Sequence, residues 1–347
     1  MLPDDARILG IETSCDDTSA AVLEAGTRIR SNVVASQINV HRPYGGVVPE
    51  LASRQHILSI GPVVEEALAK ASVGWEGIHA LSVTQGPGLI GSLLVGVSVA
   101  KAIAYARRLP LIGVNHLEGH LRSNFLVDPS IPLPAVSLVV SGGHTSLYEL
   151  REEGRYHRVA RTRDDAAGEA FDKVAKLLGL GYPGGPVIDR LAERGDAAAV
   201  RFPPVKMSDG SLDFSFSGLK TAAVRFIEQH GLAAEAPTAG PAEPPPVVLD
   251  LCASFRRAVV AALAERAFRV ARKLQARAVC VAGGVACNLE LRRRFAREAG
   301  ALGILSHFPP PSLSTDNAAM IAAAGWLHLR RGRTSGLDLT ADPDLEL

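Results

Sequence analysis

Two histidines stand four positions apart in the segment His116-Leu117-Glu118-Gly119-His120. On a helix such positions share one face, so both imidazoles could reach a single metal ion. Glu118 would lie about 200° around that helix from His116, at about 100° per residue. It therefore cannot activate water as the glutamate of an HExxH metalloprotease does. The pair alone fits equally well two histidines at a helix cap or at the edge of a core.

A third ligand for such an ion is offered by Asp316, in the segment Ser314-Thr315-Asp316-Asn317. These polar residues directly precede small apolar residues at 318–325, which predicts a helix with Asp316 near its N-terminus, facing a cleft. The alternative is that Ser314, Thr315 or Asp316 caps the helix, a common role for these residue types. Two histidines and one aspartate leave coordination positions open, as a catalytic metal site requires.

Glycine-rich segments recur at 141–144, 181–186 and 283–288. Glycine lets backbone N–H groups approach an anion closely, and a turn between a strand and a helix places phosphate at the helix N-terminus. Each segment taken alone also fits an ordinary tight turn, but three of them favour a nucleotide cleft. The sequence has no GxxxxGK[ST] and no GxGxxG after its first predicted strand, which excludes P-loop and Rossmann nucleotide sites.

Charged residues stand beside these glycine turns, namely Asp172, Lys173 and Asp189. The two carboxylates could bind hydroxyl groups or the amide of a ligand. The alternative is that all three are solvated charges on the faces of helices.

The elements that must carry these residues follow from hydrophobic patterning. Two hairpins are alike in layout, each being an apolar strand, a small polar turn and a second apolar strand. The likeness predicts a duplicated architecture in which one hairpin opens each of two lobes. The expected strands lie at 7–12, 20–24, 135–140 and 145–150.

Strands and helices alternate after each hairpin, which predicts an α/β protein with a partly parallel sheet. The proline-rich segment 236–246 predicts a loop, and the polar tail 332–347 is expected to return over the surface. The expected helices lie at 49–71, 88–108, 247–275 and from about 288 to 299, and the expected strands at 80–84, 111–114 and 278–282.

Length and composition narrow the class of protein. A chain of 347 residues is too long for one small core, and 47% hydrophobic with 21% charged residues is typical of a soluble globular protein. The net charge of +1 gives no overall attraction to nucleic acid, so any RNA contact must come from local patches. Aromatic residues make up only 5% of the chain, which argues against base stacking as the main mode of RNA recognition.

Three features bear on the cellular compartment. The four cysteines show no CxxC spacing, which favours reduced thiols in the cytosol over a disulfide framework or a zinc knuckle. The N-terminus lacks the apolar segment of a secretory signal. The stretch 88–106 imitates a membrane span but carries Lys101, and a helix buried in a core is the expected structure.

Together these motifs resemble the tRNA N6-adenosine threonylcarbamoyltransferase family of the bacterial TsaD/Gcp type, formerly called O-sialoglycoprotein endopeptidases. The matching segments run in order from about residue 7 to about residue 325, nearly the whole chain. Ser314 stands where many members have cysteine, and the segment 236–246 looks like an insertion, but neither departure touches a proposed ligand. The segments that carry the resemblance are Gly10-Ile11-Glu12-Thr13-Ser14-Cys15-Asp16-Asp17-Thr18, Tyr44-Gly45-Gly46-Val47-Val48-Pro49-Glu50-Leu51-Ala52-Ser53-Arg54, Gln85-Gly86-Pro87-Gly88, His116-Leu117-Glu118-Gly119-His120, Ser141-Gly142-Gly143-His144-Thr145, Phe171-Asp172-Lys173-Val174-Ala175-Lys176, Ser215-Phe216-Ser217-Gly218-Leu219-Lys220-Thr221 and Ala282-Gly283-Gly284-Val285-Ala286.

The resemblance implies an actin-like (ASKHA) α/β fold, in which two RNase H-like lobes surround a central nucleotide cleft. The N-terminal lobe would span 1–130 and be completed by a C-terminal helix at about 318–347. The C-terminal lobe would span 131–317.

The resemblance also implies the site residues. His116, His120 and Asp316 would bind one divalent metal ion per subunit, either iron or zinc. No catalytic residue is implied beyond this metal site. The residues that would hold threonylcarbamoyl-AMP are Val139, Val140, Ser141, Gly142, Gly143, Asp172, Gly185, Asp189 and Asn288.

The implied activity is that of an acyltransferase in the cytoplasm. It would transfer the threonylcarbamoyl group from threonylcarbamoyl-AMP to N6 of the adenosine 3′ of the anticodon in tRNAs reading ANN codons, and release AMP. AMP is a good leaving group and a metal can act as Lewis acid, which explains the lack of a cysteine or serine triad. The implied partners are tRNA, a dimerising paralogue of the TsaB type and a small ATPase of the TsaE type, without a membrane.

Three other functions use some of the same features. A sugar or acetate kinase would share the fold and the glycine turns but would leave the histidine pair unexplained. A metalloprotease lacks its HExxH motif, and a non-catalytic scaffold would have lost the three ligands. For RNA, the arginines at 292–297 and 330–333 form basic clusters, for which solvated helix faces are the alternative.

Overall fold

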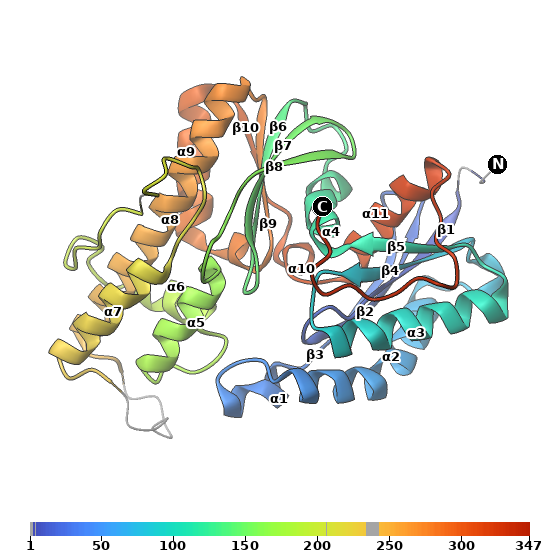
Figure 1. Ribbon diagram of the computed structural model, residues 1–347, viewed down its shortest axis with the longest axis horizontal. Helices are drawn as coiled ribbons and strands as arrows, with labels where there is room; N and C mark the ends of the chain where they lie inside the picture. The colour runs from blue at the N-terminus through green and yellow to red at the C-terminus, as the bar shows by residue number, and fades with distance from the viewer. Residues whose placement is uncertain (1–2, 4, 206, 234–242) are drawn as a thin grey trace. The chain divides into compact units, whose positions relative to one another are not determined.

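The computed structural model describes residue 3 and residues 5–205, 207–233 and 243–347 (Figure 1). The chain divides into two compact units, one made of Met1–Ile131 with Ser312–Leu347 and the other of Pro132–Pro311. Each unit is built around its own five-stranded mixed sheet. Because residues 312–317 belong to the first unit, Asp316 shares a unit with both histidines.

The sheet of the first unit has the order β3-β2-β1-β4-β5. The first three strands form an antiparallel meander, β4 then pairs in parallel with β1, and β5 pairs in parallel with β4. The parallel additions require helical connections, which the chain supplies between the strands. The strands are β1 (Arg7–Glu12), β2 (Asp17–Glu24), β3 (Arg28–Ser36), β4 (Ala80–Gly86) and β5 (Leu111–Asn115).

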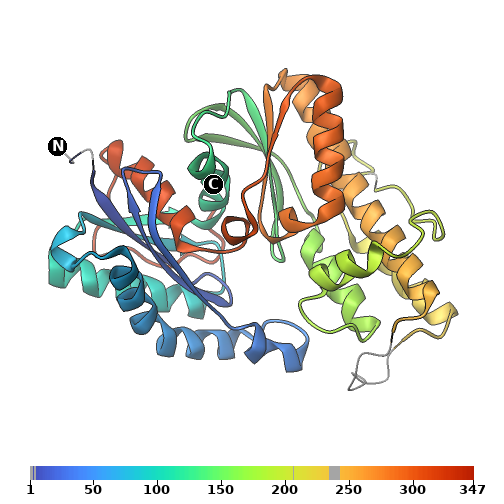
Figure 2. The ribbon, with the colours of Figure 1, turned by 180° about the vertical axis from the view of Figure 1, so that it is seen from behind.

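Helices cover both faces of this sheet. Successive residues of a strand point to opposite faces, and Leu9 accordingly packs with helices α2 (Pro49–Ala71) and α3 (Ile90–Arg107). Its neighbour Ile8 packs on the other side with α11 (Ala318–Arg330) and the end of α4 (His116–Val127). Figure 2, which views the ribbon from behind, shows α11 in red next to the strands of this sheet. A strand buried on both faces reads as a continuous apolar run, which is why β1 was predictable.

The second unit repeats the same topology. Its sheet has the order β10-β9-β6-β7-β8, in which β6, β7 and β8 form the antiparallel meander, β9 pairs in parallel with β6, and β10 pairs in parallel with β9. The duplicated architecture predicted from the two hairpins is therefore confirmed. The strands are β6 (Ala135–Val140), β7 (Thr145–Glu152), β8 (Arg155–Arg161), β9 (Ala278–Ala282) and β10 (Leu305–His307).

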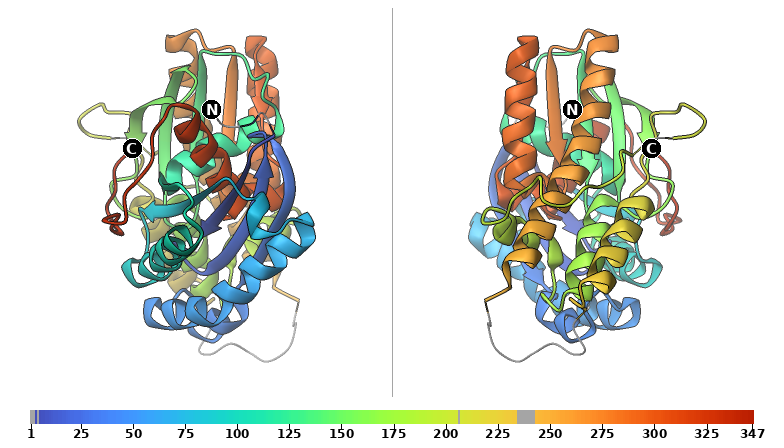
Figure 3. Two further views of the ribbon diagram at one scale, coloured as in Figure 1. Left: turned by 90° about the vertical axis from the view of Figure 1, so that its right-hand side faces the viewer. Right: turned by 90° about the vertical axis from the view of Figure 1, so that its left-hand side faces the viewer.

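The helices of the second unit share one apolar core with its sheet. Phe255 of the long helix α8 packs against Phe171, with 5.5 Å between the two ring centroids. Figure 3 shows α8 and α9 side by side. The helices are α5 (Ala167–Leu177), α6 (Gly184–Ala192), α7 (Ser217–Gln229), α8 (Pro246–Leu274) and α9 (Leu289–Leu302).

Short helical turns complete the chain at α1 (Ile38–His41), η1 (Arg42–Tyr44), η2 (Trp75–Gly77), η3 (Gly284–Cys287) and α10 (Pro311–Ser314). Of the predicted proline-rich loop 236–246, residues 236–242 lie outside the described residues. Pro246 already begins α8. The helix expected over about 318–347 ends at Arg330, because the polar tail that follows bonds to strand β5 instead.

Helix α3 corrects one expectation from the sequence. It is not buried in a core but packs on the sheet by one face, through Leu93, Val97 and Ala100. Its other face leaves Leu94 49% exposed. Among the described residues α3 is the one helix long and apolar enough to cross a membrane, and it is 33% buried. A single helix of this kind is weak evidence for a membrane span.

Candidate metal centre and nucleotide-binding residues

Helix α4 brings the two histidines together at the end of strand β5. Asn115, the last residue of β5, caps the helix, and its side-chain oxygen accepts a hydrogen bond from the N–H of Leu117 at 2.9 Å. One turn separates His116 from His120, and their rings lie 4.7 Å apart between centroids at 82°. The helical placement that the four-residue spacing predicts is present, and both side chains are buried.

Asp316 stands just before helix α11. The cap of this helix is Asn317, whose side-chain oxygen accepts from the N–H of Met320 at 3.1 Å. The alternative that Ser314, Thr315 or Asp316 caps the helix is therefore wrong. The cap falls one residue later, which leaves the Asp316 carboxylate beside the histidines instead of on the helix backbone.

The three side chains converge. Oδ1 of Asp316 lies 3.1 Å from Nε2 of His120 and 3.6 Å from Nε2 of His116. One ligand atom from each residue lies within 4.8 Å of the other two. Atoms bound about 2 Å from one tetrahedral ion would be separated by about 3.3 Å. The spacing therefore matches that of donors around a single ion.

The orientation of His120 also fits a metal better than a hydrogen bond. Its ring is fully buried: Nε2 meets Oδ1 of Asp316 at 3.1 Å without hydrogen-bond alignment, and Nδ1 has no hydrogen-bond partner in the part of the chain that the structure describes. A buried nitrogen with a poorly aligned partner is costly, and a metal ion between Nε2 and the Asp316 carboxylate would satisfy both groups. The Asp316 side chain is 23% exposed, so the group can be reached from solvent. This His-His-Asp group could hold a metal ion.

Glu12 also belongs to this group, because it contacts His116. It was not identified as a site residue from the sequence. Its Oε2 lies 2.9 Å from Nδ1 of His116 and accepts a second hydrogen bond from Thr84 Oγ1 at 2.7 Å. Its other oxygen accepts from the backbone N–H of Ser14. A carboxylate on Nδ1 fixes the ring and keeps Nε2 for a metal, as in other metal sites with histidine ligands.

The sequence did contain a signal for Glu12. It is the one charged residue in the otherwise apolar stretch Ile8–Glu12 of β1, at the strand's carboxyl end. An acid placed there is fully buried and needs partners. Ligand sites of α/β sheets lie at these carboxyl ends, so the position itself is informative.

The side chains of this group carry more negative than positive charge, which favours the binding of a cation. Burial opposes it, but the charges of Glu12 and Asp316 raise the pKa of His116 to about 9. Burial lowers the pKa of His120 below its usual range. Burial and the nearby Asp316 raise the pKa of Asp17 to about 7. Several carboxylates thus surround one protonated imidazole, and a divalent cation would neutralise the surplus negative charge.

The glycine turn of the second unit connects β6 to β7. Ser141 closes the turn, since its N–H donates to the carbonyl of His144 at 2.8 Å and its hydroxyl accepts from the N–H of His144 at 3.1 Å. Gly142 and Gly143 are exposed at the tip. Val139 and Val140 are fully buried strand residues, so only their backbone could meet a ligand.

Six glycines at or next to the predicted ligand segments differ in what surrounds them. A Cβ at Gly168, Gly184 or Gly283 would strike atoms of the chain itself, so packing alone accounts for them. A Cβ at Gly142, Gly143 or Gly185 would meet nothing within 4 Å, and none of the three has a left-handed backbone. The chain's own packing therefore gives no reason for glycine at these three positions, whereas close approach of a ligand would.

The acids beside the glycine turns are bonded within the unit and are not free helix-face charges. Oδ1 of Asp172 accepts from the N–H groups of Gly184 and Gly185 at 2.7 and 3.3 Å, at the start of α6. Asp189 accepts from Arg256 at 2.8 Å and from the N–H of Leu289 at 3.0 Å. Lys173 pairs with Asp165 at 2.6 Å.

Asn288 is the N-cap of α9. Its Oδ1 accepts from the N–H of Leu291 at 2.9 Å, and the side chain is buried. All nine residues predicted to hold the adenylate lie in the second unit. The three residues predicted to bind the metal lie in the first.

The arginines at the start of α9 are occupied by the chain itself. Arg292 donates to the carbonyls of Ala286 and Pro309 at 2.7 and 2.8 Å, and Arg293 pairs with Glu193. Arg294 pairs with Glu298 at 2.7 Å. These contacts stabilise the unit and reduce what the cluster offers to RNA phosphates.

Comparison with known sequences gives one consistent result. The sequence model of the family "TsaD: tRNA N6-adenosine threonylcarbamoyltransferase" matches residues 28–323. A protein of this name from Anaeromyxobacter dehalogenans strain 2CP-C is 56% identical over 338 residues, covering 97% of this chain and 98% of its own. Namesakes from Geobacter metallireducens and Clostridium perfringens are 53% and 47% identical, each covering at least 95% of both chains.

Solved structures of low sequence identity share the fold. Component A of (R)-2-hydroxyglutaryl-CoA dehydratase from Acidaminococcus fermentans has a TM-score of 0.55 at 15% identity, covering 94% of this chain and 100% of its own. HypF from T. kodakarensis has a TM-score of 0.60 at 14% identity, covering 95% of this chain and 48% of its own. With the repeated mixed sheets, this likeness confirms the actin-like α/β fold.

Proposed function

The chain belongs to the tRNA N6-adenosine threonylcarbamoyltransferase family, and we propose that its His116, His120 and Asp316 hold the divalent metal ion that assists this transfer. Family membership makes the protein a transferase that forms N6-threonylcarbamoyladenosine in tRNA. The observation that carries the metal proposal is the convergence of the three ligand atoms within 4.8 Å, with both imidazoles buried.

The proposed donor is threonylcarbamoyl-AMP, and the acceptor is N6 of the adenosine 3′ of the anticodon in tRNAs reading ANN codons. N6 forms a bond to the carbamoyl carbon, the bond from that carbon to the phosphate oxygen breaks, and AMP leaves with the electron pair. The proton lost from N6 passes to solvent. The exocyclic amine is a weak nucleophile, so the carbonyl must be activated.

When bound, the metal supplies Lewis-acid stabilisation of the oxyanion that develops on the carbonyl oxygen. The residues of the chain prepare this site. Glu12 holds Nδ1 of His116, which directs Nε2 toward Asp316. Asp316 contributes a negative charge and, being part-exposed, leaves one side open for substrate.

The donor atoms restrict the identity of the metal. Two imidazole nitrogens and one carboxylate oxygen with open positions suit zinc, and the same set is the facial triad of non-haem iron(II). We propose one such ion, iron or zinc, per subunit.

For the adenylate we propose the second unit, through the backbone of 139–143 and the start of α6 and α9. The open space at Gly142, Gly143 and Gly185 supports this proposal. N–H groups at a glycine turn and at a helix N-terminus bind phosphate, which anchors the AMP leaving group. Asp172, Asp189 and Asn288 hold these backbone segments in place.

The proposed function also involves two partner proteins. We propose a dimerising paralogue of the TsaB type and a small ATPase of the TsaE type. The exposed apolar groove between α2 and α3 supports the first partner, since a paralogue of the same fold would present an equivalent helix pair to it. Ile57 on α2 is 64% exposed there and Leu94 on α3 is 49% exposed.

Mass spectrometry of nucleosides tests the metal proposal. Wild type and His116→Ala are incubated with tRNA, threonylcarbamoyl-AMP and the partner proteins, and N6-threonylcarbamoyladenosine is quantified. His157→Ala, at an exposed histidine of β8, is the matched control. We expect full product from wild type and the control, and a loss of at least about 100-fold from His116→Ala. Equal product from His116→Ala would refute the metal role.

A further inference from the structure

The last residues of the chain, 334–347, form a segment that we call the C-terminal strap. It follows α11 and returns along the sheet of the first unit, drawn in dark red in Figure 1. It has no helix of its own. Its backbone is held to the rest of the unit at separate points.

The first half of the strap bonds to strand β5 and to helix α3. The N–H of Ser335 donates to the carbonyl of Leu111 at 2.7 Å, and its hydroxyl accepts from the N–H of Gly113 at 3.1 Å. Lys101 donates to the carbonyl of Leu339 at 3.0 Å. Leu339 is itself buried in the core between the sheet, α2 and α3.

The second half bonds to the segments that carry the metal site. The N–H of Asp342 donates to the carbonyl of Gln85 at 2.9 Å, at the end of β4. The Asn115 amide donates to the carbonyl of Leu345 at 3.1 Å. Both contact points lie at the carboxyl ends of neighbouring parallel strands, where α4 begins.

Asn115 joins the strap to the histidine helix through one side chain. Its oxygen caps α4, and its amide nitrogen holds Leu345 of the strap. The next residue in the chain is His116. A change in the rotamer of Asn115 would therefore break the cap and the strap contact together.

Gly86 shows how close the strap lies. A Cβ at this position would overlap the carbonyl oxygen of Asp342 and come within 3.0 Å of the Cβ of Leu345. Gly86 does not have a left-handed backbone, so its conformation does not require glycine. The approach of the strap is the physical reason for glycine here.

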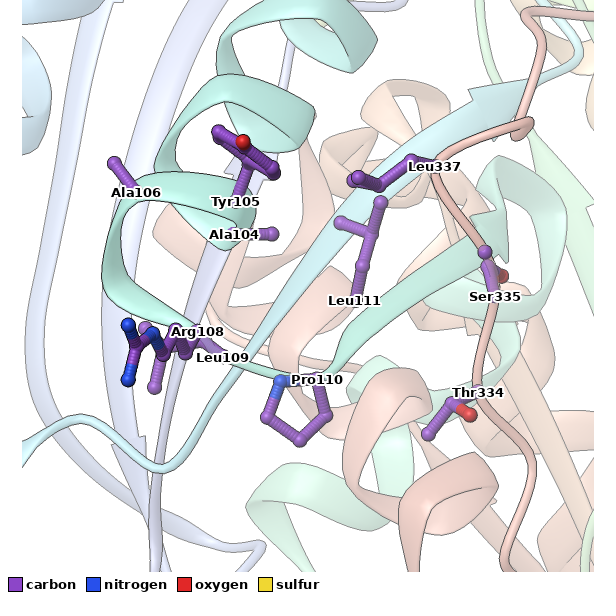
Figure 4. A pocket seen from close by; sticks show the side chains of 11 residues that line it. Ala104, Tyr105, Ala106, Arg108, Leu109, Pro110, Leu111, Thr334, Ser335 and Leu337 are labelled. Carbon is purple, nitrogen blue, oxygen red and sulfur yellow. The ribbon is translucent and has the colours of Figure 1, made fainter.

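The apolar packing of the strap is concentrated at Leu339 and Ala341, which belong to or pack against the core of the first unit. An open hollow of about 580 Å³ separates part of it from the end of α3, and Figure 4 shows Leu337 facing Tyr105 across it. Leu337 is about half exposed. Residues 342–347 follow the anchor at Leu339 and Ala341 and are held by the hydrogen bonds of Asp342 and Leu345, so this second half can detach while Leu339 stays in the core.

We propose that the C-terminal strap is a positioning element that holds the first turn of α4 and so sets the metal affinity of the histidine pair. The proposal rests on the metal role of His116 and His120 given above. Attached, the strap fixes the cap of α4 and the direction of Nε2 of His116. Detached, it leaves Asn115 free to change rotamer, and the ligand geometry loosens.

Three variants detach the strap in different ways. Deletion of residues 342–347 removes its second half. Gly86→Ala pushes it away without deleting it. Asn115→Ser keeps a side-chain oxygen that caps the helix but removes the amide donor. Leu345→Ala is the matched control, because it shortens a side chain and keeps the backbone carbonyl that Asn115 binds.

Two readouts are taken on the full-length protein and each variant. Hydrogen exchange measures the protection of residues 115–120, and titration with Co²⁺ alone measures its Kd from the ligand-field absorption. We expect faster exchange in the first turn of α4 and a Kd about tenfold weaker in all three variants, as for loss of an outer contact to a metal ligand. The control should match wild type.

A variant that combines Gly86→Ala with the deletion of residues 342–347 shows whether the two changes act through the same contact. Gly86→Ala in the shortened chain should add nothing to the effect of the deletion, because the carbonyl that its methyl group strikes is gone. Unchanged exchange or unchanged Co²⁺ affinity in the strap variants would overturn the proposal. If wild type binds no Co²⁺, the metal role itself fails, and the exchange data alone then decide whether the strap holds α4.

Discussion

At the scale of single residues, the site is a row of acid, imidazole and acid. Glu12 lies 2.9 Å from one nitrogen of His116, and Asp316 lies 3.6 Å from the other. The inner acid is fully buried, whereas the outer acid is part-exposed. The inner contact therefore orients the ring, and the outer position is where a ligand can enter.

Glu12→Gln tests this division of roles. An amide can still occupy the space, but it loses the charge that holds the Nδ1 proton of His116. We expect the Kd for Zn²⁺ to weaken 10- to 100-fold, the usual cost of losing an outer contact to a metal ligand. Competition with a chromogenic chelator measures this Kd. Glu65→Gln, at an exposed position of α2, should leave it unchanged, and the same result for Glu12→Gln would contradict the positioning role.

Asp17→Asn tests the crowding of acids beside the site. Burial raises the pKa of Asp17 to about 7, above its ordinary value of 3.8, and its Oδ1 has no hydrogen-bond partner among the described residues. The unfolded chain therefore loses this proton at lower pH than the folded protein. As a result, the free energy of unfolding of the wild type decreases as the pH rises from about 4 to about 7.

The asparagine variant lacks this penalty. In metal-free protein we expect its Tm to exceed that of wild type at pH 8, with the difference shrinking as the pH falls toward 4. Thermal unfolding followed by circular dichroism measures both. A variant that is less stable than wild type at pH 8 would show that the Asp17 carboxylate is stabilising in its ionised form.

At the scale of elements, the hairpin β6–β7 carries the glycine turn that we propose binds the adenylate. Gly142→Ala adds a methyl group where the chain leaves open space, so the fold should keep its Tm within about 2 °C. The same methyl group would occupy the space of a bound phosphate, and we expect adenylate affinity to fall at least about tenfold. Calorimetry with a non-hydrolysable adenylate measures this, with Gly300→Ala, another glycine with open space, as control.

Most elements could be predicted because their apolar periodicity is local. Residues 7–12, 49–71 and 278–282 were predicted with the bounds that the structure has. Strands β3 and β8 were not predicted, since both lie at sheet edges and mix exposed with buried residues. Helix α3 was predicted as a helix, but composition alone could not show that one apolar face stays exposed.

The site was harder to predict because its geometry comes from distant parts of the chain. The spacing of His116 and His120 predicts a shared helix face, which is local information. The partners Glu12 and Asp316 come from 104 residues earlier and about 200 residues later, and only the folded sheet brings them together. Likewise, a run of four polar residues could not show that Asn317 is the cap of α11.

At the scale of the whole molecule, one topology is used twice. The units have the same strand order, yet the first carries the three proposed metal ligands and the second carries the glycine turns proposed for the adenylate. The chain returns to its first unit at Ser312, which delivers Asp316 to α4. This return explains why three ligands so far apart in the sequence share one unit. Family membership also leaves the kinase, protease and scaffold alternatives without support.

The proposed contact with the TsaB-type paralogue is the apolar groove between α2 and α3. Leu94→Glu places a charge in the apolar groove between α2 and α3, and burying it against a partner would be costly. We expect association with the TsaB-type paralogue to weaken at least about 100-fold, as measured by analytical ultracentrifugation. Leu305→Glu, at a leucine of β10 that is 53% exposed, is the control and should bind normally. Normal association of Leu94→Glu would place the partner elsewhere.

The metal centre can be located directly by anomalous diffraction from crystals of the protein grown with zinc. We expect one strong peak in the anomalous difference map, from a zinc ion bound by Nε2 of His116, Nε2 of His120 and a carboxylate oxygen of Asp316 at about 2.0–2.2 Å. A fully ordered site without a peak, or a peak held by other residues, would contradict the proposed metal site.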